Sequence, residues 1–268
     1  MNKILTDCHL HSSFSFDSEC NLLDIINTAI KNNYTHICLT DHYDLDFPKE
    51  YNMDFTFDLD IYFKTLKEAV KKYSESITIL SGIELGLMPH LNNDINSLIK
   101  GYDFDYIIGS THIVDNMDPY YPEYWEQNDI SYAYKKYFTT SIENIENNDK
   151  FDAFGHLDYI SRYDATKSYT PQQYQTYIDE ILKLLIEKDK ALEINSAGLK
   201  KNLQLTNPDI YTLKRYKKLG GKLITIGSDA HDATSIGYGF DTVYNMLKEA
   251  DFNHYNLYIN RVPYEIGL

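Results

Sequence analysis

Short apolar runs alternate along the chain with longer segments in which apolar residues recur at helical spacing. The runs predict seven strands, at 4–8, 37–40, 77–83, 106–110, 151–155, 192–195 and 223–228. The longer segments predict helices near 22–30, 58–73, 94–100, 130–147, 170–189 and 207–220. Asn21 is placed to cap the first of these helices, and Gly220 with Gly221 is placed to end the last.

This strict alternation of strands and helices indicates a parallel sheet with right-handed crossovers. Seven such units in 268 residues favour a closed barrel over an open sheet. We therefore expect an α/β fold, a seven-stranded (β/α)7 barrel resembling a TIM barrel, with functional residues at the C-terminal ends of its strands. No repeat, low-complexity tract or linker divides the sequence, so residues 1–268 are expected to form a single domain.

Two segments carry signals of their own. Residues 115–128 contain Pro119, Pro122 and the only tryptophan, and we expect them to form a loop over the functional residues. The pattern at Thr170-Pro171-x-Gln173 is that of a capping box with proline at the first helical position. It is expected to open the helix that runs to about residue 189.

Composition and charge narrow the classes of partner. The net charge of −15 and the presence of only three arginines speak against a nucleic-acid partner, because nucleic-acid binding normally leaves a basic footprint. No apolar run reaches the roughly 18 residues of a membrane span, and the N-terminus turns acidic at Asp7 before a signal-peptide core could form. Cys8 and Cys38 lie in apolar strand patterns, where we expect them to be buried as small hydrophobic residues. Buried free cysteines of this kind are typical of a protein in a reducing compartment. We expect a cytoplasmic protein without a membrane partner, whose oligomeric state stays open.

His9 and His11 stand at the end of the first predicted strand. Successive strand side chains alternate in direction, so these two share one face, about 6–7 Å apart at roughly 3.3 Å per residue. Two imidazoles at this spacing can bind one divalent ion. Taken alone, the pair is better explained as two surface or hydrogen-bonded histidines.

The ends of the other predicted strands supply more residues of the same kind. They are His42, Glu84, His112, His156, Asp229 and His231. Six of the nine histidines therefore lie at strand exits, which converge at one mouth of a parallel barrel. Chance or structural use could account for one or two of them but not for six, so the sequence predicts a metal site. The other three histidines, His36, His90 and His254, are expected to be structural or exposed.

These residues resemble the motifs of the polymerase and histidinol phosphatase (PHP) family of metal-dependent phosphoesterases. The motifs are His9-Leu10-His11, Thr40-Asp41-His42, Gly82-Ile83-Glu84, Ser110-Thr111-His112, Gly155-His156 and Gly227-Ser228-Asp229-Ala230-His231. The resemblance runs from Asp7 to His231 and implies a distorted seven-stranded barrel. It also implies two or three divalent metal ions, which would be zinc, manganese or iron.

Carried over residue by residue, the resemblance implies three metal sites. The first would take His9, His11, Glu84 and Asp229; the second would share Glu84 and add His112 and His156; the third would take Asp17, His42 and His231. Some members of the family have histidine where Asp17 stands, so the third site would be richer in oxygen here. Its occupancy and its metal are left open.

Two segments, 155–163 and 193–200, resemble the histidinol-phosphate phosphatase branch of the family. In the first, Arg162 would bind the substrate phosphate through its planar guanidinium, with a surface salt bridge as the alternative. Many relatives carry arginine where Lys200 stands. Lys200 would therefore keep the positive charge of a second phosphate contact but lose the fork geometry.

The resemblance implies hydrolysis of a small phosphorylated substrate, with L-histidinol phosphate of histidine biosynthesis as the leading candidate. A hydroxide bridging two metals would attack phosphorus in line, and Asp17, His42 and His231 would lie near the leaving group that must be protonated. Candidates for contacts with the amine and imidazole of histidinol are Asp44, Asp46, Tyr120 and Trp125. The alternatives are a PHP-type phosphatase for nucleotides, sugars or phosphotyrosine, a 3′–5′ exonuclease, and a non-catalytic metal-stabilised module.

Overall fold

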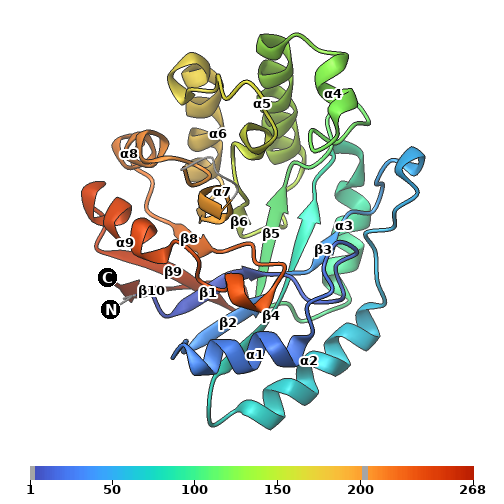
Figure 1. Cartoon of the computed structure of the whole chain (residues 1–268), viewed down its shortest axis with the longest axis vertical. Helices are drawn as coiled ribbons and strands as arrows, with labels where there is room; N and C mark the ends of the chain where they lie inside the picture. The colour runs from blue at the N-terminus through green and yellow to red at the C-terminus, as the bar shows by residue number, and fades with distance from the viewer. Residues whose placement is uncertain (1–3, 201–204) are drawn as a thin grey trace.

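A computed structural model describes residues 4–200 and 205–268. Within these ranges seven parallel strands form a nearly closed barrel with helices packed around it (Figure 1). The strands follow in the order β1 (Thr6–Leu10), β2 (His36–Leu39), β4 (Thr78–Gly86), β5 (Tyr106–Ser110), β6 (Ala153–Phe154), β7 (Ala191–Asn195) and β8 (Ile224–Gly227). A short strand, β3 (His42–Tyr43), pairs with β4 beyond the end of β2. The predicted α/β barrel is confirmed.

Six outer helices form where the apolar spacing predicts them. They are α1 (Leu22–Lys31), α2 (Leu59–Tyr73), α3 (Asn92–Lys100), α5 (Ile130–Asn147), α6 (Gln175–Glu187) and α8 (Ile210–Leu219). A further helix, α9 (Phe240–Glu249), lies outside the predicted ranges. Asn21 caps α1 by accepting a hydrogen bond from the Leu23 N–H, and α1 turns Ile25, Ile26 and Ala29 into the core. Gly220 ends α8 with a φ of +102°, a left-handed conformation that glycine adopts without strain.

The barrel closes where β1 meets β8. Leu10 and Ala230 form a parallel bridge, and the His11 N–H donates to the Ala230 carbonyl oxygen at 3.0 Å. The Asp229 N–H donates to the His9 carbonyl oxygen at 2.9 Å. The first and the last of the predicted metal ligands along the chain are therefore neighbours at the C-terminal mouth of the barrel.

Three local predictions need correction. The segment 115–128 is not wholly a loop, because it contains α4 (Pro122–Glu126). Thr170 makes no side-chain capping hydrogen bond, since a 3₁₀ turn (Pro171–Tyr174) intervenes before α6. The helix predicted to open at 207–208 begins at Ile210, because its capping hydrogen bond comes from Asp209, whose side chain accepts from the Thr212 N–H.

The sequence did not predict the C-terminal hairpin of β9 (His254–Ile259) and β10 (Val262–Gly267). Leu257 and Tyr258 pack inside the barrel in one apolar cluster with residues of six barrel strands, which include Cys8 and Cys38. At the hairpin turn, the Arg261 guanidinium donates to the Asp152 carboxylate and to the Lys150 carbonyl oxygen. The hairpin thus closes the end of the barrel opposite the mouth.

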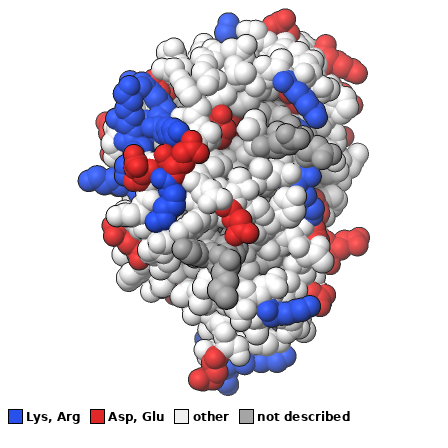
Figure 2. All heavy atoms as spheres, turned by 60° about the vertical axis from the view of Figure 1, so that its left-hand side comes forward, with Lys and Arg blue, Asp and Glu red and all other residues white. Residues whose placement is uncertain are grey.

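The surface charge and the lengths of the helices bear on the predictions about nucleic-acid and membrane partners. On the face in Figure 2, Lys and Arg side chains form separate groups beside Asp and Glu rather than a continuous basic strip. None of the helices in 4–200 and 205–268 is long and apolar enough to cross a bilayer. The single domain over residues 1–268 and the absence of a nucleic-acid partner stay predictions.

Candidate metal centre and active site

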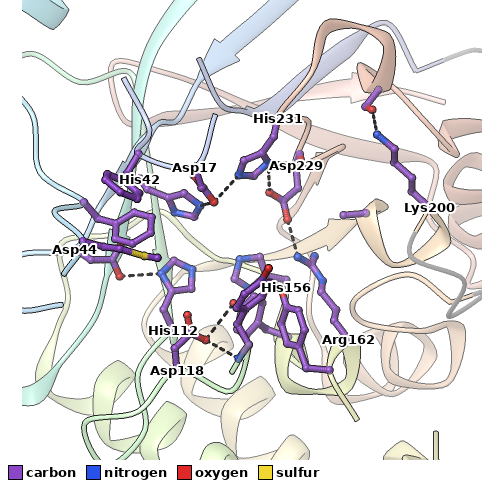
Figure 3. Close-up of a pocket in the computed structure, with 18 of the residues that line it drawn as sticks. Asp17, His42, Asp44, His112, Asp118, His156, Arg162, Lys200, Asp229 and His231 are labelled. Atoms are coloured by element: carbon purple, nitrogen blue, oxygen red, sulfur yellow. Dashed lines mark hydrogen bonds and ion pairs between the residues drawn. The ribbon is translucent and has the colours of Figure 1, made fainter. Parts of the chain in front are cut away.

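A cavity of about 600 Å³ opens at the C-terminal mouth of the barrel, and the candidate residues line it or lie directly beneath it (Figure 3). They come from strand ends and from the loops that follow. His9 lies in β1 and His11 follows it, Asp17 lies in the loop after β1, His42 begins β3, Glu84 lies in β4, His112 follows β5, His156 follows β6, and Asp229 and His231 follow β8. The barrel brings all nine residues together.

Glu84 stands at the centre of the group and is fully buried. Its Oε1 lies 2.8 Å from His156 Nε2 and 3.3 Å from His112 Nε2. Its Oε2 lies 2.8 Å from His42 Nδ1 and 3.3 Å from His9 Nε2. With His11 Nε2 at 3.6 Å from Oε2, one carboxylate faces five imidazoles, an arrangement suited to a carboxylate shared between two ions.

Asp229 forms a second centre beside the first. Its Oδ1 lies 3.3 Å from His11 Nε2, 3.7 Å from His9 Nε2 and 3.7 Å from His231 Nδ1. The backbone of Asp229 is left-handed, with a φ of +55°, a conformation that aspartate tolerates better than most residues. The buried Asp7 supports this turn, because its carboxylate accepts the N–H groups of Ser228 and Gly237 at 3.0 and 2.9 Å.

Asp17 lies at the outer edge of the group and is 43 % exposed. Its Oδ2 lies 3.2 Å from His231 Nε2 and 3.7 Å from His42 Nε2, so the three residues assigned to the third site are neighbours. His42 faces Asp17 with one ring nitrogen and Glu84 with the other. His42 consequently lies between the second and third predicted sites.

The donor set fits a divalent cation. Four overlapping trios have ligand atoms within 4.8 Å of one another, and their members are His9, His11, His42, Glu84, His112, His156, Asp229 and His231. Several buried atoms of this group make no hydrogen bond of suitable geometry, even where another of them lies close by, and each such atom costs about 1–3 kcal/mol. They are Nε2 of His9, His11 and His112, Nδ1 of His42 and His156, and Oε2 of Glu84. Imidazole nitrogens and carboxylate oxygens left free in this way are the ligands that zinc and similar ions take.

Glu193 orients two of the histidines from below. One oxygen of its buried carboxylate lies 2.5 Å from Nδ1 of the His9 imidazole, and the other accepts the backbone N–H of His156 at 2.8 Å. A carboxylate at Nδ1 fixes the tautomer in which Nε2 is free to bind a metal. The sequence analysis gave Glu193 no role, although an acidic residue inside a strand buried on both faces was a signal for one.

Other acidic residues position the remaining ligands. Asp44 Oδ1 lies 2.9 Å from His112 Nδ1, again on the nitrogen that points away from the centre. Asp41 accepts the Ser15 hydroxyl at 2.8 Å, and the Ser15 oxygen lies 3.0 Å from His11 Nδ1. Neither role was predicted from the sequence, because Asp44 lies 68 positions from His112 and Asp41 lies 26 positions from Ser15.

The two central carboxylates stay ionised in spite of their burial. Burial raises the pKa of Glu84, but the neighbouring His9 and His42 hold that pKa well below its usual range. Burial also raises the pKa of Asp229, and His9 together with Arg162 lowers it well below its usual range. Both side chains therefore offer negatively charged oxygens at neutral pH.

Arg162 and Lys200 differ in their access to the cavity. Arg162 lies in the cavity wall with its side chain 3 % exposed, and Nη1 donates to Asp229 Oδ2 at 2.7 Å. Lys200 is 50 % exposed, and its ammonium donates to Asp232 Oδ2 at 2.7 Å and to the Ser235 hydroxyl. Figure 3 shows Arg162 turned toward Asp229 and Lys200 at the outer edge of the site.

The loop candidates for substrate contacts are only partly at the cavity. Tyr120 and Asp44 line it, but Asp44 is engaged with His112. Asp46 pairs with the exposed His90 at 2.9 Å, and Trp125 Nε1 donates to the Pro119 carbonyl oxygen, so neither fits the role. Asp118, which was not among the expected contacts, also lines the cavity and is 8 % exposed.

Comparison with known proteins adds three findings. The PHP domain model matches residues 7–197. A probable histidinol-phosphatase of Clostridium acetobutylicum is 36% identical over 248 residues, which cover 91% of this chain and 92% of the relative. The histidinol-phosphatase of Lactococcus lactis is 32% identical over 92% of this chain and 91% of the relative.

Solved structures give the same architecture. The crystal structure of histidinol phosphate phosphatase from Lactococcus lactis, complexed with zinc, L-histidinol and phosphate, has a TM-score of 0.88 and 29% sequence identity. It is matched over 97% of this chain and 99% of that chain. A putative histidinol phosphatase from Listeria monocytogenes has a TM-score of 0.77 at 19% identity, covers 88% of this chain and 99% of that chain, and shows the fold alone.

Proposed function

Since the chain belongs to the PHP domain family, we propose that it is a metal-dependent phosphomonoesterase that hydrolyses L-histidinol phosphate to L-histidinol and phosphate. The observation that carries this proposal is the convergence of nine candidate ligands, with Glu84 and Asp229 among them, at one cavity that Arg162 also lines. Relatives with this name match over nearly the whole chain, so the substrate class follows from more than the shared domain.

Divalent metal ions are the cofactor that the site fits, and we infer two or three of them, as zinc, manganese or iron. We assign His9, His11, Glu84 and Asp229 to the first site, Glu84, His112 and His156 to the second, and Asp17, His42 and His231 to the third. When bound, such ions would lower the pKa of a water from about 15.7 to about 7 and draw charge from the phosphoryl oxygens.

The protein's own residues would position the phosphate and move the proton. Arg162 would bind phosphoryl oxygens through the N–H groups that its protein partners leave free, which favours in-line attack of water on phosphorus. As the new O–P bond forms, the ester P–O bond breaks and the departing alkoxide takes a proton. When no ion occupies the third site, Asp17, His42 and His231 lie free at the outer edge of the group, where one of them would deliver that proton. Lys200 would join the phosphate only after leaving Asp232.

The other end of the substrate would meet the cavity wall beyond the metal ligands. Phe16, Phe55 and Tyr120 line this part, and Asp118 adds a buried carboxylate. Burial raises the pKa of Asp118 to about 6, and a cationic amine beside it would bring that pKa down. Aromatic faces and a carboxylate suit the amine and imidazole of histidinol.

Steady-state hydrolysis tests this function. After chelation, the protein is reloaded with zinc, manganese or iron and assayed with histidinol phosphate beside nucleoside monophosphates, sugar phosphates and phosphotyrosine. We expect kcat/KM for histidinol phosphate to exceed that for the panel by about a hundredfold or more, because buried polar groups reject substrates that leave them unpaired. Equal, weak turnover of the whole panel would remove histidinol phosphate as the substrate and leave the phosphatase class intact.

The non-catalytic alternative predicts a different result in the same assay. A metal-stabilised module would retain its ions and unfold on chelation, yet hydrolyse none of the phosphoesters. We also propose a cytoplasmic location and no nucleic-acid partner, on the basis of three free cysteines and the acidic charge.

A further inference from the structure

The Arg162 guanidinium is fixed on three sides by side-chain oxygens. Nη1 donates to Asp229 Oδ2 and Nη2 to Asn195 Oδ1, both at 2.7 Å, while Nε donates to Asn207 Oδ1 at 2.9 Å. Three of the five guanidinium N–H groups are therefore engaged, and each Nη keeps one for a ligand. The side chain has no freedom to choose another orientation without breaking charge-assisted bonds.

Asn195 and Asn207 are joined to each other through the backbone. The N–H of each donates to the carbonyl oxygen of the other at 2.9 Å, which couples the end of β7 to the segment before α8. The two side-chain oxygens that receive Arg162 thus belong to one rigid unit rather than to two independent loops.

Buried partners set which way each amide points. Asn207 Nδ2 donates to Asp158 Oδ1 at 2.8 Å and to the Ser161 hydroxyl at 3.1 Å. Asn195 Nδ2 donates to Glu193 Oε2 at 3.2 Å and to Asp229 Oδ2 at 3.3 Å. Because an amide offers donors on one side only, these bonds turn both Oδ1 atoms toward the guanidinium.

We propose that Asn195 and Asn207 are positioning residues, which aim the Arg162 guanidinium at the phosphate of the substrate while leaving its positive charge available. This inference rests on the function proposed above. Two of these three acceptors are neutral amides, so among the hydrogen-bond partners of the guanidinium within residues 4–200 and 205–268 only Asp229 is an anion. Carboxylates at the two positions would hold the same geometry and cancel the charge that attracts phosphate.

A double-mutant cycle on the metal-loaded protein tests the proposal. The variants are Arg162→Ala, Asn207→Ala and the double variant, with Asn147→Ala, an exposed position on α5, as the matched control. The readouts are the inhibition constant of inorganic phosphate and kcat/KM. We expect Asn207→Ala to raise the inhibition constant about tenfold or more in the native background, because one charge-assisted bond is lost. In the Arg162→Ala background it should change nothing.

Chemical rescue gives an independent readout. Millimolar guanidinium chloride, far below denaturing concentrations, should restore part of the activity of Arg162→Ala, because both asparagine oxygens remain to hold the free ion. The double variant should not be rescued. Equal effects of Asn207→Ala in both backgrounds, or equal rescue of both variants, would overturn the proposal.

Two further measures ensure that the experiment gives a clear answer. If Asn207→Ala fails to fold, the same double-mutant cycle is run with Asn195→Ala, which removes the amide on β7. If guanidinium rescues neither variant, the result of the double-mutant cycle alone supports or overturns the proposal. Inhibition or binding by inorganic phosphate does not require that histidinol phosphate be the substrate. A protein that binds phosphate through this cycle but does not hydrolyse histidinol phosphate would contradict the proposed function and support the positioning role.

Discussion

Replacing Glu193 with glutamine should weaken metal binding more than it weakens catalysis. The carboxylate receives His9 Nδ1 at 2.5 Å on one oxygen, and on the other the His156 N–H at 2.8 Å and the amide of Asn195 at 3.2 Å. Glutamine has nearly the same size but turns one of these acceptors into a donor. Either orientation of the amide then places a donor against a donor or forces His9 into its other tautomer.

The magnitude follows from these bonds. A hydrogen bond to a charged group contributes about 1.5–3 kcal/mol, and a donor left unpaired in the interior costs about as much again. For a residue that orients a metal ligand, the expected loss is about 10- to 100-fold in metal affinity. With metal in large excess, kcat should return to within about tenfold of the native value, since no group that touches the substrate has changed.

Metal affinity is measured by competition with a chelating indicator, and kcat over a series of metal concentrations. Glu180→Gln, at an exposed position on α6, changes the net charge equally without touching the site and serves as the control. Unchanged metal affinity in Glu193→Gln would refute the reasoning, and so would an equal loss in the control.

Three further results are expected. Asp44→Asn should weaken metal affinity by about tenfold, measured in the same competition assay, because it removes the carboxylate from His112; unchanged affinity would argue against this role. Gly227→Ala should abolish activity and metal binding, since a methyl group there would overlap the His9 Cβ; an active variant would contradict it. Burial raises the pKa of Asp118 from 3.8 to about 6, so the folded chain keeps a proton that the unfolded chain loses. Stability therefore falls as pH rises through that window, by about 3 kcal/mol, and Asp118→Asn should remove this slope in urea titrations of metal-depleted protein.

Much of the site could be predicted because a parallel barrel turns sequence position into spatial position. A residue that ends a strand reaches the C-terminal mouth whatever its distance in the chain, so His11, Glu84 and His156 could be placed together from strand patterns alone. The same reasoning located the cavity that Arg162 lines.

The supporting residues could not be found in this way. Glu193 acts on His9 across 184 positions and Asn207 on Arg162 across 45, and no local pattern records such pairings. Thr170 shows the opposite failure, because its local capping signal was present but a 3₁₀ turn satisfies the backbone there instead. The barrel strands were recognised partly by the helix or candidate ligand that follows each of them. Neither follows the hairpin 254–267, and it was therefore missed.

The barrel closes at a seam between β1 and β8, and a metal ion bound there would stabilise this seam in addition to its chemical role. His9 and His11 stand on one side of the seam and Asp229 on the other, more than two hundred residues apart in the chain. A cation held between them would fasten this junction as a cross-link, much as a disulfide closes a long loop in a secreted protein. The supply of metal in the cell would then govern how much folded enzyme exists, as well as how fast each molecule works.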